Sequence, residues 1–347
     1  MVTQKDVAKL AGVSISTVSR VLNGSSLVDG ETKKNVESAI KKLNYKPNLV
    51  AYGLRAKSSK LIGLILPELV HQAYSMIAQY VETRASDKGY SMILGVHRNN
   101  PECEKWLIDD FQRRNVDGII LQPVHDEPHT SANLKEYTRV PMVLYGQSFS
   151  SDQMGTVQLD NYKAGIMAAE HFVKLGHRHI ACTAGPINME YLRERLNGFR
   201  DGLTKHNIVI IQQDICACEL NYQVPGVVSG QRAVMQFLDG RDRKDYPTAI
   251  WAHNDLVAVG IIKELHQRKI RVPEDVSVIG MDNMVLTDMI YPPLTTIGQP
   301  LEQMATMSVD ILLKEIELKE QYVPENIRME PQLIIRQSTG KYSENVI

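Results

Sequence analysis

Residues 6–24 of the chain read DVAKLAGVSISTVSRVLNG. Apolar residues recur at helical spacing on either side of Gly12, which predicts two short helices joined by a tight turn. Thr3 can cap the first helix and Ser14 can cap the second. Asp6, in the first turn, favours the N-terminus of the first helix. The stretch therefore predicts the first two helices of a small helical unit.

A third helix is predicted after Asp29, where apolar residues return at helical spacing at Val36, Ala39, Ile40 and Leu43. Three such helices form a helix-turn-helix unit, whose second helix can enter the major groove of DNA. The side chains that we expect on its outward face are Ile15, Ser16, Thr17, Ser19, Arg20 and Asn23. Arginine can form two hydrogen bonds to guanine, and serine and threonine reach bases or phosphates.

The distribution of charge agrees with a DNA-binding end. Residues 1–60 contain eleven Lys+Arg and four Asp+Glu, a net charge of +7. The remaining 287 residues contain 28 basic and 36 acidic residues, a net charge of −8. A basic end on an acidic body predicts that the first 60 residues meet a polyanion. The alternatives are a solvated charged face or a helical unit that binds protein.

The stretch LNYKPNLVAYGLR, residues 43–55, follows the third helix. Together with residues 6–24 it resembles the N-terminal signature of the LacI/GalR family of bacterial transcription regulators. The resemblance implies that the second helix reads half an operator. It also implies a hinge at residues 47–59 that folds only on DNA and inserts Leu54 into the minor groove, where an apolar wedge kinks the duplex.

The hinge sequence fits this role, because the six residues 49–54 are too few for a helix that is stable alone in water. A plain linker is the alternative. The residues that we expect to contact DNA are Thr3, Ser14, Ile15, Ser16, Thr17, Ser19, Arg20, Asn23, Tyr45, Asn48 and Leu54.

From residue 60 onward, apolar strands alternate with amphipathic helical stretches. The first four predicted strands start 30, 27 and 23 residues apart, which is the length of a βαβ unit. The predicted strands are Leu61–Leu66, Ser91–Gly95, Gly118–Gln122, Pro141–Tyr145, His179–Thr183, Thr248–Ala252 and Val276–Gly280. Because these strands are nearly all apolar, we expect two doubly wound halves with buried parallel sheets.

The body also resembles the effector-binding core of the same family, which is related to periplasmic sugar-binding proteins. The motifs that carry this resemblance include VDGIIL, RLNGF, PTAIWAHNDLVAVG, RVPEDVSVIGMDN and PPLTTIGQP. The expected organisation is a helix-turn-helix domain at 1–46, a hinge at 47–59 and a core at 60–347, with a first half of about 60–160 plus 293–322 and a second of about 161–292 plus 323–340.

Several polar and aromatic residues follow predicted strands, where ligands bind in open α/β sheets. The expected effector-binding residues are Tyr74, Asp160, Arg195, Tyr222, Asn254 and Asp282. Such a set suits a small polyhydroxylated ligand. The resemblance places effector contacts at four of them: Tyr74, Arg195, Asn254 and Asp282. Each could instead be a helix cap or a salt bridge, as Asn254 could be for a helix over residues 256–266.

One wall of this site departs from the family pattern. After Pro67 the family often has Asp-x-x-Asn-Pro-Phe-Phe/Tyr, whereas this chain has ELVHQAY at residues 68–74. Tyr74 keeps the usual type. The class of ligand therefore stays open.

Signals for other functions are weak. The Cys216-x-Cys218 pair has no second Cys/His pair at a zinc-like spacing, and we expect no metal, no cofactor and no catalysis. Lys5 and Lys9 argue against a secretory signal, and four cysteines in 347 residues fit a reducing compartment. The run Leu61–Leu66 is far shorter than the ~18 residues of a membrane-spanning helix. We therefore expect a cytoplasmic protein that does not meet a membrane.

These observations predict a sequence-specific DNA-binding transcriptional regulator, a repressor, which a sugar or sugar derivative controls from a site between the two halves of the core. We expect a homodimer on a pseudo-palindromic operator, because two recognition helices must be spaced along the duplex. The alternatives are a cytoplasmic small-molecule-binding protein without a role in gene regulation and an enzyme of the doubly wound class.

Overall fold

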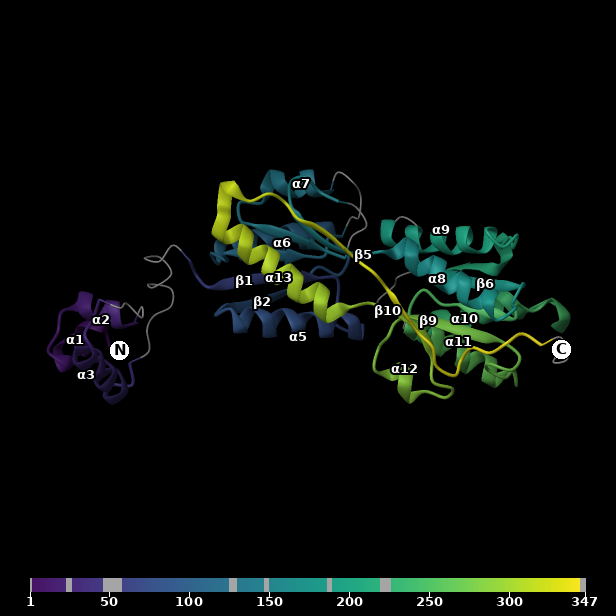
Figure 1. Cartoon of the computed structure of the whole chain (residues 1–347), viewed down its shortest axis with the longest axis horizontal. Helices are drawn as coiled ribbons and strands as arrows, with labels where there is room; N and C mark the ends of the chain where they lie inside the picture. Colours follow the sequence, from purple (N-terminus) through teal and green to yellow (C-terminus); the bar gives the residue numbers. More distant parts are fainter. Residues whose placement is uncertain are drawn as a thin grey trace. The chain divides into compact units, whose positions relative to one another are not determined.

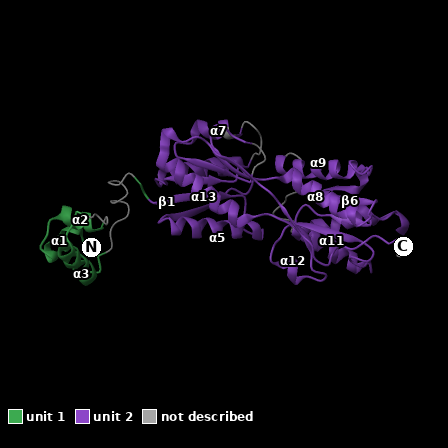
Figure 2. Cartoon of the chain, viewed as in Figure 1, with its two compact units in different colours: residues 1–59 green, residues 60–347 purple. Residues whose placement is uncertain are grey.

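The chain divides into two compact units, residues 1–59 and 60–347 (Figure 2). A computed structural model describes residues 2–22, 27–45, 58–124, 130–146, 150–185, 189–218 and 226–343. Among the residues expected to contact DNA or effector, Asn23, Asn48, Leu54 and Tyr222 lie outside these ranges.

The first unit contains three helices, α1 (Gln4–Ala11), α2 (Ile15–Leu22) and α3 (Gly30–Lys42). Thr3 and Asp6 cap α1 reciprocally: the Asp6 carboxylate accepts a hydrogen bond from the Thr3 backbone N–H at 2.9 Å, and Thr3 Oγ1 accepts one from the Asp6 N–H. Gly12 ends α1 with a φ of 67°, a left-handed conformation that glycine adopts without strain. The predicted turn between α1 and α2 is therefore confirmed.

A small apolar core joins these helices. It contains the buried residues Val7, Ala8, Val18, Val21, Val36, Ala39 and Tyr45. At the end of α2, Val21 is buried and Leu22 is only partly buried. The core leaves the polar face of α2 exposed.

The second unit contains two six-stranded sheets (Figure 1). The first has the order β11-β5-β4-β3-β1-β2 and is parallel throughout; the second has the order β12-β10-β9-β8-β6-β7, and only its edge strand β12 is antiparallel. The strands are β1 (Leu61–Leu66), β2 (Ser91–Val96), β3 (Gly118–Leu121), β4 (Met142–Tyr145), β5 (Gly155–Leu159), β6 (Ile180–Ala184), β7 (Ile215–Ala217), β8 (Ala249–Trp251), β9 (Ser277–Asp282), β10 (Thr295–Gly298), β11 (Asn326–Met329) and β12 (Gln332–Ile334). The two doubly wound halves predicted from the sequence are confirmed.

Helices cover both faces of each sheet. In the first half α5 and α13 pack in one apolar core and α6 and α7 in another; in the second half α8 and α9 cover one face, and α10 and α11 the other. The helices are α5 (Gln72–Asp87), α6 (Pro101–Arg113), α7 (Thr130–Tyr137), α8 (Asn161–Lys174), α9 (Glu190–Thr204), α10 (Gly226–Leu238), α11 (Asp255–Gln267), the short α12 (Leu286–Met289) and α13 (Leu301–Leu318).

Two boundaries between the halves differ from those expected. The sequence predicts that residues 293–322 belong to the first half, but strand β10 pairs with β9 in the second sheet. It predicts that residues 323–340 belong to the second half, but strand β11 pairs with β5 in the first sheet. The chain therefore crosses between the sheets after β5, after β10 and after β11. Strands this short carry no pairing information in their own residues, so only the folded sheets show the crossings.

Glycine lets α8 and α9 approach closely. A Cβ on Gly198 would lie 2.0 Å from the carbonyl oxygen of Tyr162, and a Cβ on Gly165 would lie 2.1 Å from the carbonyl oxygen of Arg195. No side chain fits at either position without moving backbone. This close contact fixes the position of α9, and with it Arg195, relative to α8.

We therefore expect Gly198→Ala to push α8 and α9 apart and to lower the free energy of unfolding of the second unit by about 1–3 kcal/mol. Urea unfolding followed by tryptophan fluorescence measures this, because the ring of Trp251 lies 4.6 Å from that of Phe199 on α9. Gly30→Ala is the control, since an added Cβ there meets nothing within 4 Å. Equal unfolding curves for Gly198→Ala and the unchanged chain would contradict the proposed packing.

Candidate functional site

The exposed face of α2 is polar and begins with a cluster of hydroxyl groups. Ser14 Oγ lies 2.7 Å from Ser16 Oγ and 2.8 Å from Thr17 Oγ1, and it accepts a hydrogen bond from the Thr17 backbone N–H at 3.1 Å. Ser14 thus caps α2 as predicted. Ile15 is 46% exposed at the first position of the helix. These short side chains leave the start of α2 open to a partner.

Arg20 lies further along the same helix and is exposed. Within residues 2–22 and 27–45 it has no hydrogen bond or ion pair, so its guanidinium is available. Thr17 and Ser19 are partly exposed, whereas Thr3 serves mainly to cap α1. Tyr45 differs from the expectation: it belongs to the apolar core and is only 9% exposed, so little of it can reach a partner.

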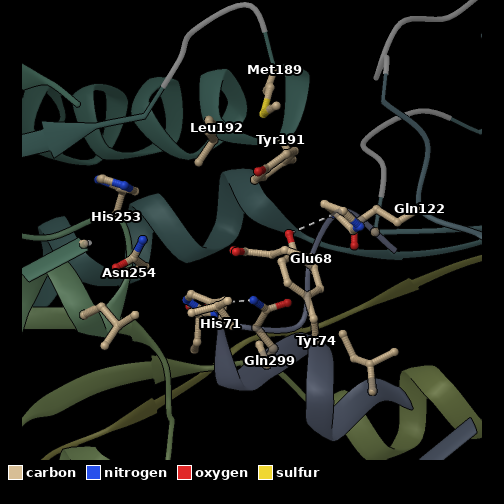
Figure 3. A pocket seen from close by; sticks show the side chains of 18 of the residues that line it. Glu68, His71, Tyr74, Gln122, Met189, Tyr191, Leu192, His253, Asn254 and Gln299 are labelled. Atoms are coloured by element: carbon tan, nitrogen blue, oxygen red, sulfur yellow. Dashed lines mark hydrogen bonds and ion pairs between the residues drawn. The ribbon is translucent and has the colours of Figure 1, made fainter. Parts of the chain in front are cut away.

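The second unit contains a cavity of about 290 Å³ that both halves line. Of the residues expected to bind effector, Tyr74 lines it from the first half, and Arg195, Asn254 and Asp282 line it from the second (Figure 3). Asp160 does not line it. Its carboxylate accepts a hydrogen bond from the Lys163 backbone N–H at 2.8 Å, so the residue is the N-terminal cap of α8.

Asn254 has two roles. Its side-chain oxygen accepts a hydrogen bond from the Val257 backbone N–H at 2.9 Å and so caps α11. The residue nevertheless lines the cavity, and no hydrogen bond from its Nδ2 is present among the described residues. The cap therefore fixes the orientation of an amide that can donate to a ligand.

Arg195 is held rigidly from the second half. It is 7% exposed; its Nε donates to Asn161 Oδ1 at 2.8 Å and its Nη1 donates to the His253 carbonyl oxygen at 3.1 Å. The guanidinium also lies over the ring of Tyr191, 5.4 Å from its centroid. Within the described part of the chain its Nη2 makes no hydrogen bond. This geometry presents one donor group of a buried cation to the cavity.

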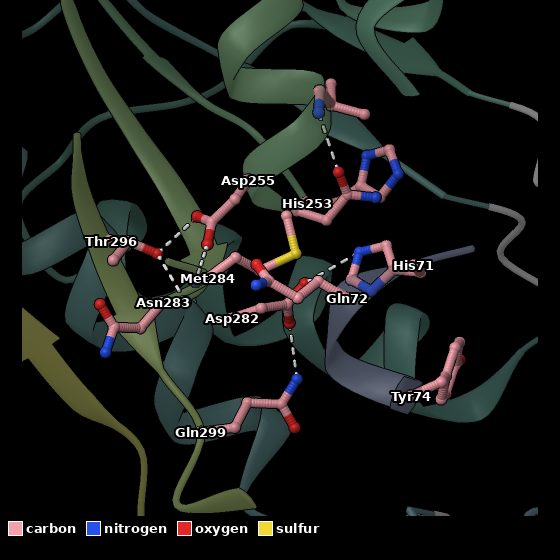
Figure 4. A network of polar contacts seen from close by, with 12 residues as sticks. His71, Gln72, Tyr74, His253, Asp255, Asp282, Asn283, Met284, Thr296 and Gln299 are labelled. Atoms are coloured by element: carbon pink, nitrogen blue, oxygen red, sulfur yellow. Dashed lines mark hydrogen bonds and ion pairs between the residues drawn. The ribbon is translucent and has the colours of Figure 1, made fainter. Parts of the chain in front are cut away.

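Asp282 ends β9 and is bonded by residues from outside that strand (Figure 4). Its carboxylate accepts a hydrogen bond from Gln299 Nε2 at 2.6 Å and lies 3.4 Å from His71 Nε2 of the first half. Its φ of 110° is unusual for a residue with a side chain, and such strained positions cluster at functional sites. Burial raises the pKa of Asp282, and the nearby His71 and Arg195 oppose that rise.

A second carboxylate, Asp255, lies behind Asp282 at the start of α11. It is fully buried and accepts hydrogen bonds from Thr296 Oγ1 at 2.6 Å and from the Met284 backbone N–H at 2.8 Å. Burial, and then repulsion by Asp282, raise the pKa of Asp255 well above its usual value. Asp255 thereby connects the end of β9 to β10 and α11, as Figure 4 shows.

The two halves touch each other at one edge of the cavity. Besides the contact between His71 and Asp282, the Val285 backbone N–H donates to Gln72 Oε1 at 3.1 Å. His71 and Gln72 lie at the start of α5 in the first half, whereas Asp282 and Val285 belong to the second. Asp282 therefore takes part both in the cavity and in the contact between the halves.

The first half adds side chains that the sequence did not single out. Glu68, Gln122 and Tyr145 line the cavity beside Tyr74, and Gln122 Nε2 donates to Tyr74 Oη at 3.3 Å. The second half likewise adds His253 and Gln299. His253 directly follows the predicted strand Thr248–Ala252, and Glu68 lies two residues after the predicted strand Leu61–Leu66, so the rule that selected the other candidates could have found both.

Other polar clusters have structural partners. His177 bonds Thr248 and Ser277 in the second half, at 3.0 and 3.1 Å. Cys216 and Cys218 are buried free thiols. Within the described residues, no group of three or more His, Cys, Asp or Glu side chains is placed to hold a metal ion. No helix in the same residues is long and apolar enough to cross a membrane.

Comparisons with known protein families match both units. The description "bacterial regulatory proteins, lacI family" matches residues 3–48, and "periplasmic binding protein-like domain" matches residues 169–339. The repressor PurR of Actinobacillus pleuropneumoniae is 32% identical over 339 residues, covering 97% of this chain and 98% of that protein. The regulator DegA of Bacillus subtilis is 31% identical, covering 96% and 97%.

Solved structures agree with this assignment. The Lac repressor dimer bound to operator and the anti-inducer ONPF has a TM-score of 0.86 and 33% identity, covering 98% of this chain and 99% of that one. The complex of the transcriptional regulator CelR with cellobiose has a TM-score of 0.70 and 29% identity, covering 97% and 100%. The chain belongs to the LacI family of bacterial transcriptional regulators, and it is a regulator rather than an enzyme.

Proposed function

We infer that the exposed face of α2 reads operator DNA and that the cavity between the two sheets binds the small-molecule effector of this repressor. The observation that carries the inference is that one chain combines a polar helix face, with Arg20 free of partners within the described residues, and a cavity lined from both halves of the core. Relatives fit this division, since one solved relative holds operator DNA and another holds cellobiose.

In this proposal, effector binding changes operator binding through the contacts between the halves at the edge of the cavity. A ligand shifts an equilibrium only by its differential affinity for the two states. The pairs His71–Asp282 and Gln72–Val285 join the halves, so a ligand that replaces or reinforces them changes the angle between the halves. The chain enters the first half at β1, directly after the hinge expected at residues 47–59, and that angle can pass to the DNA-binding unit.

The proposed assembly is a homodimer on a pseudo-palindromic operator in the cytoplasm. One copy supplies one recognition helix, and sequence-specific binding by such helices requires two at a fixed spacing along the duplex. The Lac repressor structure similar to this chain is a dimer bound to operator.

The experiment that tests the proposed function is selection of operator sequences from random DNA by the full chain, followed by gel-shift titration. We expect enrichment of a two-fold symmetric sequence. Residues 60–347 alone should not bind it, because the recognition helix lies in the first unit. A small-molecule-binding protein without a regulatory role would enrich no sequence.

Arg20→Ala should weaken binding to the selected operator by about 1–3 kcal/mol, because a bidentate bond to guanine is lost, and weaken binding to random DNA much less. Arg20→Lys should recover binding to random DNA but not operator affinity, since lysine cannot form the planar pair of bonds. Gel-shift titration on both DNAs measures this, with Lys34→Ala on α3 as a control. Equal losses on operator and random DNA would show that Arg20 contacts only phosphate.

Arg195→Ala should abolish the effector response of a reporter gene placed behind the selected operator. Loss of a buried, charged hydrogen-bond partner costs about 1.5–3 kcal/mol, or roughly 10- to 150-fold in affinity. Asp282→Asn tests the cavity from β9, and Arg193→Ala, exposed two residues earlier on α9, is the matched control.

The reporter assay also gives the sign of regulation. If the effector releases DNA, both variants should repress permanently; if it promotes binding, both should fail to repress. Thermal unfolding of the purified variants checks that each is folded. A normal response in both Arg195→Ala and Asp282→Asn would show that this cavity is not the effector site.

A further inference from the structure

Glu68 is a carboxylate in the cavity that has no partner within the part of the chain that the structure describes. It follows β1 directly after Pro67 and is partly buried, and it has no hydrogen bond or ion pair with any described residue. Figure 3 shows the side chains of Glu68, Tyr74 and Tyr191 pointing into the cavity. Burial raises the pKa of Glu68, with His71 opposing that rise, so the surroundings destabilise the ionised form. An ionised group in this position is costly until something neutralises it.

The basic side chains nearby already contact other groups. Arg195 donates to Asn161 and to the His253 carbonyl, and His71 lies against Asp282 on the opposite wall. Burial, and then Arg195, lower the pKa of His253 to about 3, so that its ring is neutral at physiological pH. Of the two carboxylates that line the cavity, Asp282 contacts Gln299 and His71, whereas Glu68 has no direct contact with any described residue that would offset its charge.

The same wall presents further polar atoms without partners. Gln122 Oε1 and Tyr145 Oη are buried and make no hydrogen bond within the described residues, and Tyr145 as a whole is only 3% exposed. A buried polar atom without a partner is rare in folded proteins and costs free energy. Gln122 Oε1 and the Glu68 carboxylate can only accept hydrogen bonds, so the missing partner on this wall is a donor.

Aromatic rings surround this acceptor wall. Tyr74 and Tyr145 line the cavity from the first half, and Tyr191 lines it from the second. Aromatic faces attract cations, and they do so more strongly where water is excluded. A carboxylate without a partner, an amide oxygen and tyrosine rings together favour a positively charged nitrogen over a phosphate or a carboxylate, which Glu68 would repel.

We propose that the effector carries a basic amine and that Glu68 is its counter-ion, which makes Glu68 the residue that selects amine-bearing ligands over their neutral and anionic counterparts. This inference rests on the proposed function of the cavity as the effector site. Arg195, Asn254 and Asp282 would bind the rest of the ligand from the second half. Glu68 and Gln122 would hold the ammonium group from the first half, so the ligand would join the two halves.

The test begins with ligand capture by the full chain. The purified protein is equilibrated by ultrafiltration with a bacterial metabolite extract supplemented with glucose, glucosamine and glucose 6-phosphate, and the retained compounds are identified by mass spectrometry. Arg195→Ala serves as the reference that lacks a working cavity. We expect the compounds retained by the unchanged chain, but not by Arg195→Ala, to carry a basic amine and no phosphate.

Glu68→Gln then tests the role of the carboxylate, because it keeps the shape of the side chain and removes its charge. Calorimetric titration with the captured amine should show affinity about 10- to 150-fold lower than for the unchanged chain, the range expected for a hydrogen bond to a charged group. Glu102→Gln, an exposed glutamate on α6, is the matched control and should bind as the unchanged chain does.

The possible outcomes separate this inference from the proposed function. Capture of a neutral, phosphorylated or carboxylated compound without an amine overturns the role of Glu68 and leaves the cavity as the effector site. Undiminished affinity for the captured amine in Glu68→Gln does the same. If the unchanged chain retains nothing beyond what Arg195→Ala retains, the cavity is not the effector site, and both proposals fail.

Discussion

The buried carboxylate of Asp282 makes the contacts that most directly join the parts of the core. It lies at the carboxyl end of β9, where burial makes the charge costly, and three neighbours compensate for that cost. Gln299 comes from the segment that crosses between the sheets, His71 from the first half and Arg195 from α9 of the second. Because these partners belong to different parts of the core, the position of the Asp282 carboxylate is coupled to the orientation of the two halves relative to each other.

The packing behind this site explains its rigidity. Gly165 and Gly198 bring α8 and α9 together with no side chain between the backbones, and Arg195 lies on α9 within that contact. Asp255 ties β9 to α11 and β10 through Thr296 and Met284. The second half therefore presents a preformed set of polar groups, whereas the first half contributes a wall whose acceptors are unsatisfied among the residues described. A ligand gains the most binding free energy where it forms hydrogen bonds that the protein itself leaves unmade.

The cavity is lined both by residues within the family's motifs and by residues of segment 68–74, which departs from the family pattern. Arg195, Asn254 and Asp282 lie within the motifs that carry the resemblance, and all three line the cavity. The segment 68–74 departs from the usual pattern, and it is this segment that brings Glu68, His71 and Tyr74 to the cavity. The general function thus follows from the shared motifs, and the proposed choice of ligand rests on the divergent wall.

Local sequence patterns were enough to predict the helix-turn-helix unit, seven strands and the division into a basic end and an α/β body, because helical spacing, capping and apolar runs act over a few residues. The folded structure was needed to show that Asp160 is a cap, that Tyr45 belongs to the core and that β10 and β11 exchange halves. It also brought Glu68 and Gln122 opposite Arg195. The Asp160 cap is a contact between residues three apart in the chain. The other features depend on contacts between residues far apart in the chain, and local patterns carry no record of such contacts.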